Sequence, residues 1–280
     1  MKASYKKLSI IIVSACLLFF SAPAPAADRP VVLGTTSMIG CLLEMLAGDA
    51  VEVRVLIPPR SCPGHYDISP GDAAGIAGAG LVIRHDFQAY LDDKLSAQNP
   101  ALEIEVLAPG GQLLVPEIFR GALEKTAAIL SRHYPASENT FRKNLAAATE
   151  QVQQAEPLAL EKIRLAGLAE TLVLGSVMQE PFLRWAGMKV ASGFTNSPDE
   201  LSVKVLARLI DTARTERVSF IAGNLHSGGE QVALALAGQT GLPVAILSNF
   251  PGTSERNSTY VDLLFDNIAL LARAKNSNLP

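Results

Sequence analysis

The sequence has few cysteines, no excess of basic residues, and no long hydrophobic run beyond its first 20 residues. Three cysteines in 280 residues are too few for a disulfide-rich scaffold. Lysine and arginine number 24 against 27 aspartate and glutamate residues, so the chain lacks the basic surface of a nucleic-acid-binding protein. No later apolar run approaches about 18 residues, and we therefore expect no membrane helix in the rest of the chain.

The common catalytic motifs are also missing. The chain contains no Gly-x-Ser-x-Gly, no His-Glu-x-x-His and no phosphate-binding Gly-x-x-x-x-Gly-Lys, and its glycine pairs lack the dinucleotide-binding spacing. A secreted hydrolase that uses a protein-bound metal remains an alternative, but no general base with a clear partner is visible. These absences favour a binding protein over an enzyme.

The N-terminal residues have the pattern of an export signal. Lys2, Lys6 and Lys7 precede the apolar run from Leu8 to Phe20, and Ala24-Pro25-Ala26 follows as a cleavage site. We therefore predict a signal peptide over residues 1–26 and a periplasmic protein. The alternative is lipoprotein processing, in which Cys16 of Val13-Ser14-Ala15-Cys16 would carry a membrane anchor. Removing residues 1–26 removes three lysines and no acid, which changes the net charge from −3 to −6.

Two cysteines, Cys41 and Cys62, remain after this cut. In an exported protein such a pair predicts a disulfide between them. Two alternatives stay open: a pair of free thiols, or a soft metal ligand at Cys62.

The remaining chain alternates between strand and helix patterns, which is typical of parallel sheets covered by helices. This predicts an α/β fold with two lobes, each with a parallel sheet flanked by helices, and a ligand cleft between the lobes. The expected strands lie at 31–35, 51–57, 81–84 and 103–107 in the first lobe and at 171–174, 189–192, 218–222 and 244–247 in the second. A helix is expected over 197–215, opened by Ser197-Pro198-Asp199-Glu200. No internal sequence repeat relates the lobes.

Residues 116–165 show no strand pattern. Phe141, Leu145, Ala148 and Val152 recur at helical spacing, so the second half of this region is predicted to be one long helix that joins the lobes. Pro157 should kink it or interrupt its hydrogen bonding. The predicted boundaries are an N-terminal lobe at 27–115, a helical region at 116–165 and a C-terminal lobe at 166–280.

Polar residues follow the ends of most predicted strands. The segment from Pro58 to Asp72 carries four prolines, the last at the start of a helix, and presents His65. In open α/β sheets the ligand lies outside the carboxyl ends of the strands. The residues expected there are His65, His85, Gln179, Glu180, His226 and Asn249. The fourth histidine, His133, falls between two helices and is expected on the surface.

Imidazoles and a carboxylate from both lobes are the ligands that Zn²⁺ and Mn²⁺ accept in proteins. We therefore predict a metal site formed by His65, His85, Glu180 and His226. Further residues expected in the cleft are Cys62, Gln179 and Asn249.

Several segments resemble the periplasmic solute-binding proteins of zinc and manganese ABC importers. The likeness extends from about Val31 to the C-terminus and is clearest in the turn at Gly48 to Val53 and in the segment from Gly64 to Asp72, where the family has Pro-His-x-Tyr/Phe-Glu-x-x-Pro-x-Asp. The resemblance implies two α/β lobes joined by a long helix. It also implies a monomer that captures zinc or manganese and passes it to an ABC permease in the inner membrane.

The family's metal ligands are only partly present. His65 matches the first ligand, whereas the second, a histidine in Asp-Pro-His-x-Trp, is replaced within Pro109-Gly110-Gly111-Gln112-Leu113. The third position falls near Met178-Gln179-Glu180 and the fourth at Ser248-Asn249. Two interpretations follow: either His85 and His226 rebuild a metal site with Glu180, or the cleft binds a metal chelate or a small organic molecule instead.

Overall fold

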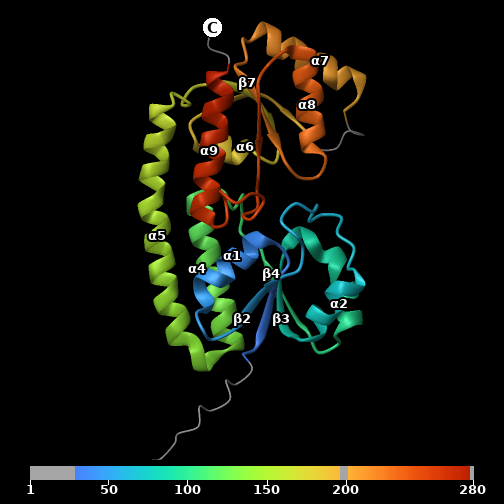
Figure 1. Cartoon of the computed structure of the whole chain (residues 1–280), viewed down its shortest axis with the longest axis vertical. Coiled ribbons are helices and arrows are strands. Elements are labelled where there is room, and N and C mark those ends of the chain that lie inside the picture. Colours follow the sequence, from blue (N-terminus) through green and yellow to red (C-terminus); the bar gives the residue numbers. More distant parts are fainter. Residues whose placement is uncertain (1–28, 196–200, 278–280) are drawn as a thin grey trace, which may run out of the picture.

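Two four-stranded parallel sheets form the two lobes of this protein. A computed structural model describes residues 29–195 and 201–277 (Figure 1). In the N-terminal lobe the strand order is β2-β1-β3-β4, and in the C-terminal lobe it is β6-β5-β7-β8. Every pairing within these sheets is parallel. The lobes therefore share one topology, although no sequence repeat relates them.

The strands begin and end close to the predicted residues. The N-terminal sheet contains β1 (Val31–Gly34), β2 (Glu52–Val55), β3 (Ala79–His85) and β4 (Glu103–Leu107). The C-terminal sheet contains β5 (Leu172–Ser176), β6 (Lys189–Phe194), β7 (Phe220–Asn224) and β8 (Val244–Leu247). The predictions for β4 and β8 are confirmed at both ends.

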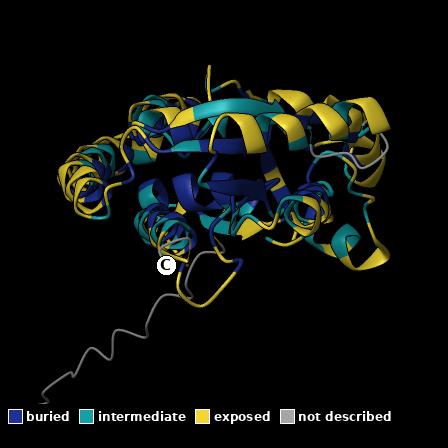
Figure 2. Ribbon diagram, turned by 90° about the horizontal axis from the view of Figure 1, so that it is seen from above, coloured by how far each residue is buried: buried dark blue, intermediate teal, exposed yellow. Residues whose placement is uncertain are grey.

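Helices pack on the faces of both sheets. The N-terminal lobe has α1 (Ser37–Ala47), α2 (Pro70–Ala77), the 3₁₀ helix η1 (Asp86–Leu91) and α3 (Asp92–Gln98). The C-terminal lobe has α6 (Glu180–Trp185), α7 (Val203–Thr215), α8 (Gly229–Thr240) and α9 (Tyr260–Asn276). Figure 2 shows the strands largely buried and the outer helix faces exposed.

Side-chain caps set several helix starts. Ser69 and Asp72 form a capping box around Pro70, as the Ser-Pro pair predicts for α2. The predicted start of α7 was wrong, because Ser202 is extended and caps Val205 N–H, so the helix begins at Val203. Residues 196–200, where the helix was expected to open, lie outside the described part of the chain.

The helical region joins the lobes along one side of the molecule (Figure 1). It consists of α4 (Pro116–His133), the short η2 (Pro135–Ser137) and α5 (Glu138–Leu165). With 28 residues, α5 is about 42 Å long. It packs against α1 and α4 and then against α9 of the C-terminal lobe. The helix continues through Pro157, which lies on its exposed side.

One hydrophobic core extends through both lobes behind the cleft. It includes Ile39 and Phe119 on the N-terminal side and Phe182 and Leu264 on the C-terminal side. Tyr260 at the start of α9 stacks on Phe119 with ring centroids 3.7 Å apart, and its hydroxyl donates to the Leu114 carbonyl at 3.0 Å. Because these contacts cross from one lobe to the other, the connection between the lobes is packed rather than flexible.

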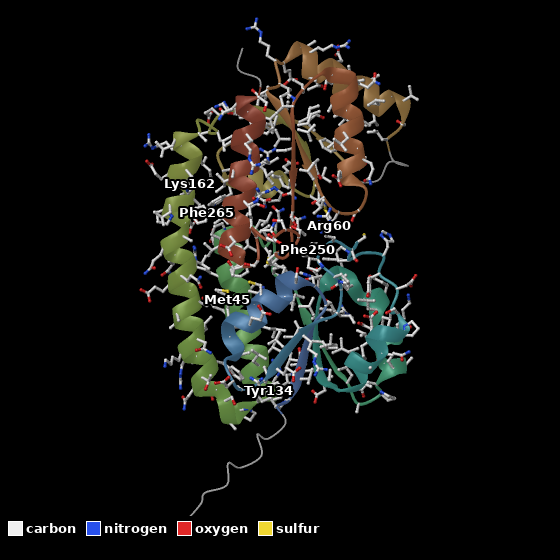
Figure 3. The ribbon with its side chains drawn as sticks, viewed as in Figure 1. Met45, Arg60, Tyr134, Lys162, Phe250 and Phe265 are labelled. Atoms are coloured by element: carbon white, nitrogen blue, oxygen red, sulfur yellow. The ribbon has the colours of Figure 1, made fainter. Side chains whose placement is uncertain are left out.

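Smaller clusters fill the far faces of the two sheets. Leu33, Ile76 and Leu95 belong to the cluster under α2 and α3, and Ile221 and Leu236 to the one under α7 and α8. Figure 3 places Lys162 of α5 beside Phe265 of α9, with the ammonium 5.7 Å from the ring centroid. In the described residues, no helix combines the length and apolarity that a bilayer span requires.

Candidate ligand site between the lobes

A cavity of about 540 Å³ lies between the lobes, at the carboxyl ends of both sheets. In each sheet the strand order reverses beside the first strand, so the loops after β1, β3, β5 and β7 meet at this point. The polar lining residues are His65, His85, Asp86, Gln112, Asn224, His226, Ser227 and Asn249. Most of the remaining lining is apolar, with Met38, Phe87, Leu113, Leu114, Met178 and Phe250 among it. Of the residues that the sequence predicted here, His65, His85, His226 and Asn249 line the cavity, whereas Cys62, Gln179 and Glu180 do not.

His65 is exposed and lines the cavity from the proline-rich loop. The Tyr90 hydroxyl fixes the loop, because it accepts from Tyr66 N–H and donates to the Pro63 carbonyl, both at 2.9 Å. His65 Nδ1 lies 3.6 Å from Cys62 Sγ. The loop therefore holds the cavity-lining imidazole of His65 beside the thiol of Cys62.

His85 ends β3 and is 4% exposed. Its Nε2 lies 2.9 Å from Thr36 Oγ1, its backbone N–H donates to Gln88 Oε1 at 3.0 Å, and its ring stacks on Phe87. Burial lowers the pKa of His85 to about 4, against the opposing charge of Asp86. At neutral pH this side chain is an uncharged imidazole whose Nε2 already has a partner.

His226 is also neutral, but one of its nitrogens is unpaired. Nε2–H donates to the Pro59 carbonyl at 2.8 Å, because a carbonyl oxygen can only accept. Nδ1 is therefore left with a lone pair and has no hydrogen-bond partner, while the residue is 3% exposed. Burial lowers the pKa of His226, the hydrogen bond to Pro59 opposes this, and the charge of Arg60 adds to it. A buried nitrogen without a hydrogen-bond partner destabilises the fold, so its presence calls for a specific explanation such as a function or a bound group.

Glu180 does not take the place that the sequence predicted for it. Its carboxylate forms an ion pair with Arg184 at 2.6 Å along α6, and it is not among the residues that line the cavity. An i,i+4 arginine on the same helix face supplies the nearest compensating charge. The described residues also include no group of three or more His, Cys, Asp and Glu side chains placed to hold a metal ion. The four-residue metal site is therefore not assembled in this form.

Three carboxamides, Gln112, Asn224 and Asn249, line the floor of the site, and a fourth, Gln179, is fully buried and bonded to two of them without lining the cavity. Asn249 Oδ1 accepts from Gln112 Nε2 at 3.0 Å and from Gln179 Nε2 at 2.9 Å. Asn224 Oδ1 accepts from Gln179 at 2.9 Å and from Asn249 Nδ2 at 3.3 Å. Gln112, Gln179 and Asn249 belong to the three segments in which the resemblance places the family's second to fourth ligands. These positions do meet in space, but here they carry uncharged groups that bond to one another.

The disulfide expected between Cys41 and Cys62 is not formed, and both residues are free thiols. Cys41 is buried in α1, where burial raises the pKa of its thiol to about 11. Cys62 is half-buried, with Sγ 3.1 Å from Ser227 Oγ. Partial burial raises the pKa of the Cys62 thiol, but hydrogen bonds with Ser227 and His65 outweigh this effect and the pKa falls below its ordinary 9.0. The two thiols therefore lie in different environments, one in the core and one at the cleft.

The proline-rich loop also contacts the opposite lobe. In addition to the Pro59–His226 bond, the Arg60 guanidinium donates to the Thr253 carbonyl at 3.2 Å. Figure 3 labels Arg60 and Phe250 in the region where the two lobes meet. Ser37 of α1 adds a further bond across the cleft, because its hydroxyl donates to the Pro251 carbonyl at 2.6 Å. The cavity is therefore bounded by direct contacts between the lobes.

His133 lies away from the cavity, as expected, but it is not a free surface residue. Its side chain is 12% exposed and lies 2.7 Å from Glu105 and 3.1 Å from Glu103. These contacts with the carboxylates of β4 give His133 a structural role at the end of α4.

Sequence reasoning missed four polar residues of the site: Thr36, Gln112, Asn224 and Ser227. Thr36 and Asn224 immediately follow or end central strands, which was a signal available from the pattern. Ser227 precedes a glycine pair and has a positive φ of 58°, a strained backbone that only the structure reveals. Gln112 was noted only as part of the segment that replaces the family's Asp-Pro-His-x-Trp motif.

Two α/β lobes of identical strand order, one long connecting helix and a cavity at the facing strand ends define a two-lobed solute-binding protein. The chain belongs to the family whose model is described as "ZnuA: Zinc-uptake complex component A periplasmic", which matches residues 32–274. This is a family of transport binding proteins, not of enzymes.

Individual relatives are distant. The "Zinc-binding lipoprotein AdcA" of Streptococcus pneumoniae serotype 4 is 23% identical over 98% of this chain and 62% of its own length. The chain thus spans about three fifths of the length of the curated relatives that it matches.

Solved structures of similar fold include a Mn-bound periplasmic metal binding protein from Candidatus Liberibacter asiaticus. It is 15% identical with a TM-score of 0.73, covering 90% of this chain and 100% of that chain. A crystal structure of ZnuA is 18% identical with a TM-score of 0.73, covering 89% and 100%. At these identities the similarity establishes the fold.

Proposed function

We propose that this chain is the exported solute-binding component of an ABC importer. It captures a divalent transition metal, zinc or manganese, in the cavity between its lobes and delivers it to a membrane permease. The signal sequence places it in the periplasm, cut near Ala26 or anchored through Cys16. The observation that carries the proposal is the convergence of three imidazoles, from both lobes, on one cavity of a protein with this fold.

Three considerations support a metal as the cargo. Neutral imidazole is a good ligand for transition metals, and burial keeps His85 and His226 neutral at physiological pH. The relatives named above are described as zinc-binding or as bound to manganese, and a further solved structure of the Liberibacter protein contains cadmium. His65 matches the family's first ligand and faces the cavity.

The proposal assigns direct metal contact to His65 and His226. Of the other two predicted ligands, His85 is bonded to Thr36 and Glu180 to Arg184, so neither is free to bind without losing a partner. In this proposal His85 lines the cavity as an uncharged side chain and does not contact the metal.

Equilibrium dialysis of the purified chain against Zn²⁺ and Mn²⁺, with metal quantified per protein, tests the proposal. We expect one metal per wild-type chain and loss of at least about tenfold in affinity for His65→Ala, because one ligand of few is removed. Affinity should also fall below about pH 6 as the imidazoles protonate. Unchanged stoichiometry and affinity in His65→Ala would remove His65 from the site.

The size of the cavity favours a second candidate, a metal that arrives bound to a small organic chelator. A volume of about 540 Å³ with a mostly apolar lining lies within the range of small-molecule sites, roughly 300–1,000 Å³, and far exceeds a bare ion. Native mass spectrometry of gently purified protein separates the two candidates. A mass increase equal to the metal alone supports the bare ion, whereas an organic mass that leaves together with the metal supports the chelate.

A further inference from the structure

The floor of the cavity is poorly suited to a cation. The carboxamide oxygens of Asn224 and Asn249 each accept two N–H donors, and Gln112 Oε1 accepts from Phe182 N–H at 2.9 Å. A metal bound here would displace these hydrogen bonds and meet no negative charge in return. Any metal held through charge and strong ligands must therefore bind elsewhere in the cleft.

The proline-rich loop beside the cavity offers a better ligand pair. Cys62 Sγ and His65 Nδ1 are 3.6 Å apart. A tetrahedral zinc ion with Zn–S of about 2.3 Å and Zn–N of about 2.0–2.1 Å separates its sulfur and nitrogen ligands by about 3.5 Å. The two atoms already have the separation of two ligands on one ion, and the proline-rich loop restricts their movement.

A third donor comes from the opposite lobe. His226 lines the same cavity, is 3% exposed and has an Nδ1 lone pair without a partner. Its other ring nitrogen donates to the Pro59 carbonyl, which is the arrangement that orients most metal-binding histidines. The next residue, Ser227, lies 3.1 Å from Cys62 Sγ, which brings this segment against the thiol.

We propose that Cys62, His65 and His226 form a thiolate–imidazole site for a thiophilic divalent cation such as Zn²⁺ or Cd²⁺, bridging the two lobes. This rests on the proposed role in metal capture and specifies which metals the cleft selects. On binding, the Cys62 S–H bond breaks, its proton passes to solvent and a sulfur–metal bond forms, without oxidation or reduction.

Two consequences follow from this ligand set. The three side chains do not yet form a group that could hold a metal in the described residues, so binding requires these side chains to reorient where the Ser227 segment already contacts the proline-rich loop. Mn²⁺ prefers oxygen ligands and gains little from a thiolate, so the site should discriminate against it.

Titration of the purified chain with Zn²⁺, Cd²⁺ and Mn²⁺ tests the site. We expect Cd²⁺ to produce a thiolate-to-metal charge-transfer band in the wild type, and Cys62→Ser to abolish the band and weaken Zn²⁺ binding at least about tenfold. His226→Gln should also weaken Zn²⁺ binding. Cys41→Ala is the matched control, because it removes the other thiol, which is buried in α1, and should leave the band and the affinity unchanged.

A readout on the wild type avoids dependence on how the variants fold. Zn²⁺ or Cd²⁺ should protect Cys62 from alkylation at least about tenfold, as followed by peptide mass spectrometry, and Mn²⁺ should not. If Zn²⁺ binds tightly but leaves Cys62 unprotected and Cys62→Ser unaffected, this inference is wrong and the proposed function stands. If no metal binds to the wild type at all, the proposed function fails and the site fails with it.

Discussion

At the scale of single residues, the pKa values of His85 and His226 are set mainly by burial rather than by neighbouring carboxylates. His85 and His226 both have lowered pKa values because their rings are removed from water. The thiol of Cys62 has a lowered pKa for a different reason, namely its hydrogen bonds with neighbours. The rings of His85 and His226 are consequently uncharged at neutral pH.

Burial of His85 should make the fold sensitive to acid. The pKa of His85 is about 4 in the folded chain and returns to about 6.5 on unfolding, so between these pH values the unfolded chain binds a proton that the folded chain does not. The free energy of unfolding should therefore fall as the pH drops from about 6.5 to about 4, by on the order of 3 kcal/mol from this residue. Urea denaturation at several pH values measures it.

The variant His85→Gln isolates this contribution, because glutamine is uncharged at every pH used. We expect the variant to be less stable than the wild type at pH 7, where it loses packing on Phe87, but to lose less stability on acidification. A variant with the same pH slope as the wild type would contradict the assignment of the acid sensitivity to His85.

At the scale of elements, proline stabilises the conformation of the proline-rich loop but removes a backbone hydrogen bond from α5. The loop uses its prolines to hold Cys62 and His65 in place, whereas α5 tolerates Pro157 inside a regular helix. Pro157 has no N–H to donate to the Gln153 carbonyl four residues earlier. Both residues are exposed, so water can reach this carbonyl and reduce the cost.

Replacing Pro157 by alanine should stabilise the protein. Alanine is about 3 kcal/mol more favourable than proline inside a helix, and the greater freedom of the unfolded chain offsets about 0.4–1 kcal/mol of this. We expect a net gain of about 2 kcal/mol in the free energy of unfolding, measured by urea denaturation. The exposed neighbour Gln153→Ala is the control and should change stability by less than about 0.5 kcal/mol. A loss of stability in Pro157→Ala would mean that the packing of α5 requires a bend at this residue.

At the scale of the whole molecule, the two lobes are joined by a shared core. The core cluster contains residues of both sheets and of α1, α4, α5 and α9, and α5 packs on both lobes. A rigid connecting helix of this kind limits lobe motion to small adjustments around the ligand. The loop contacts across the cleft, such as Pro59 with His226, add a second point of attachment on the ligand side.

Because the core is continuous, we expect the lobes to unfold together. Differential scanning calorimetry should give one transition whose calorimetric and van't Hoff enthalpies agree. Ile163→Ala, which removes a buried side chain of α5 from this core, should lower the melting temperature while keeping one transition. Two resolved transitions would show that the lobes are separate cooperative units despite their shared contacts.

Much of the fold could be predicted because its causes are local. The 2-residue and 3.6-residue periodicities, the Ser69-Pro70 cap and the position of Pro116 act within a few neighbours, and they placed the strands and most helices correctly. The rule for parallel sheets then placed His65, His85 and His226 at one cleft, since strand ends share an edge whatever the pairing in detail.

The chemistry of the cleft was decided by tertiary structure. Glu180 is the exception, because its partner Arg184 lies four residues further along the same helix and was visible in the sequence. The absent disulfide, the unpaired Nδ1 of His226 and the bonding among the carboxamides depend on contacts between segments up to 167 residues apart. Local sequence fixes helices, strands and the side-chain pairs within one helix. The partners of the side chains in the cleft are fixed only when distant segments pack, and that packing determines which lone pairs remain free for a ligand.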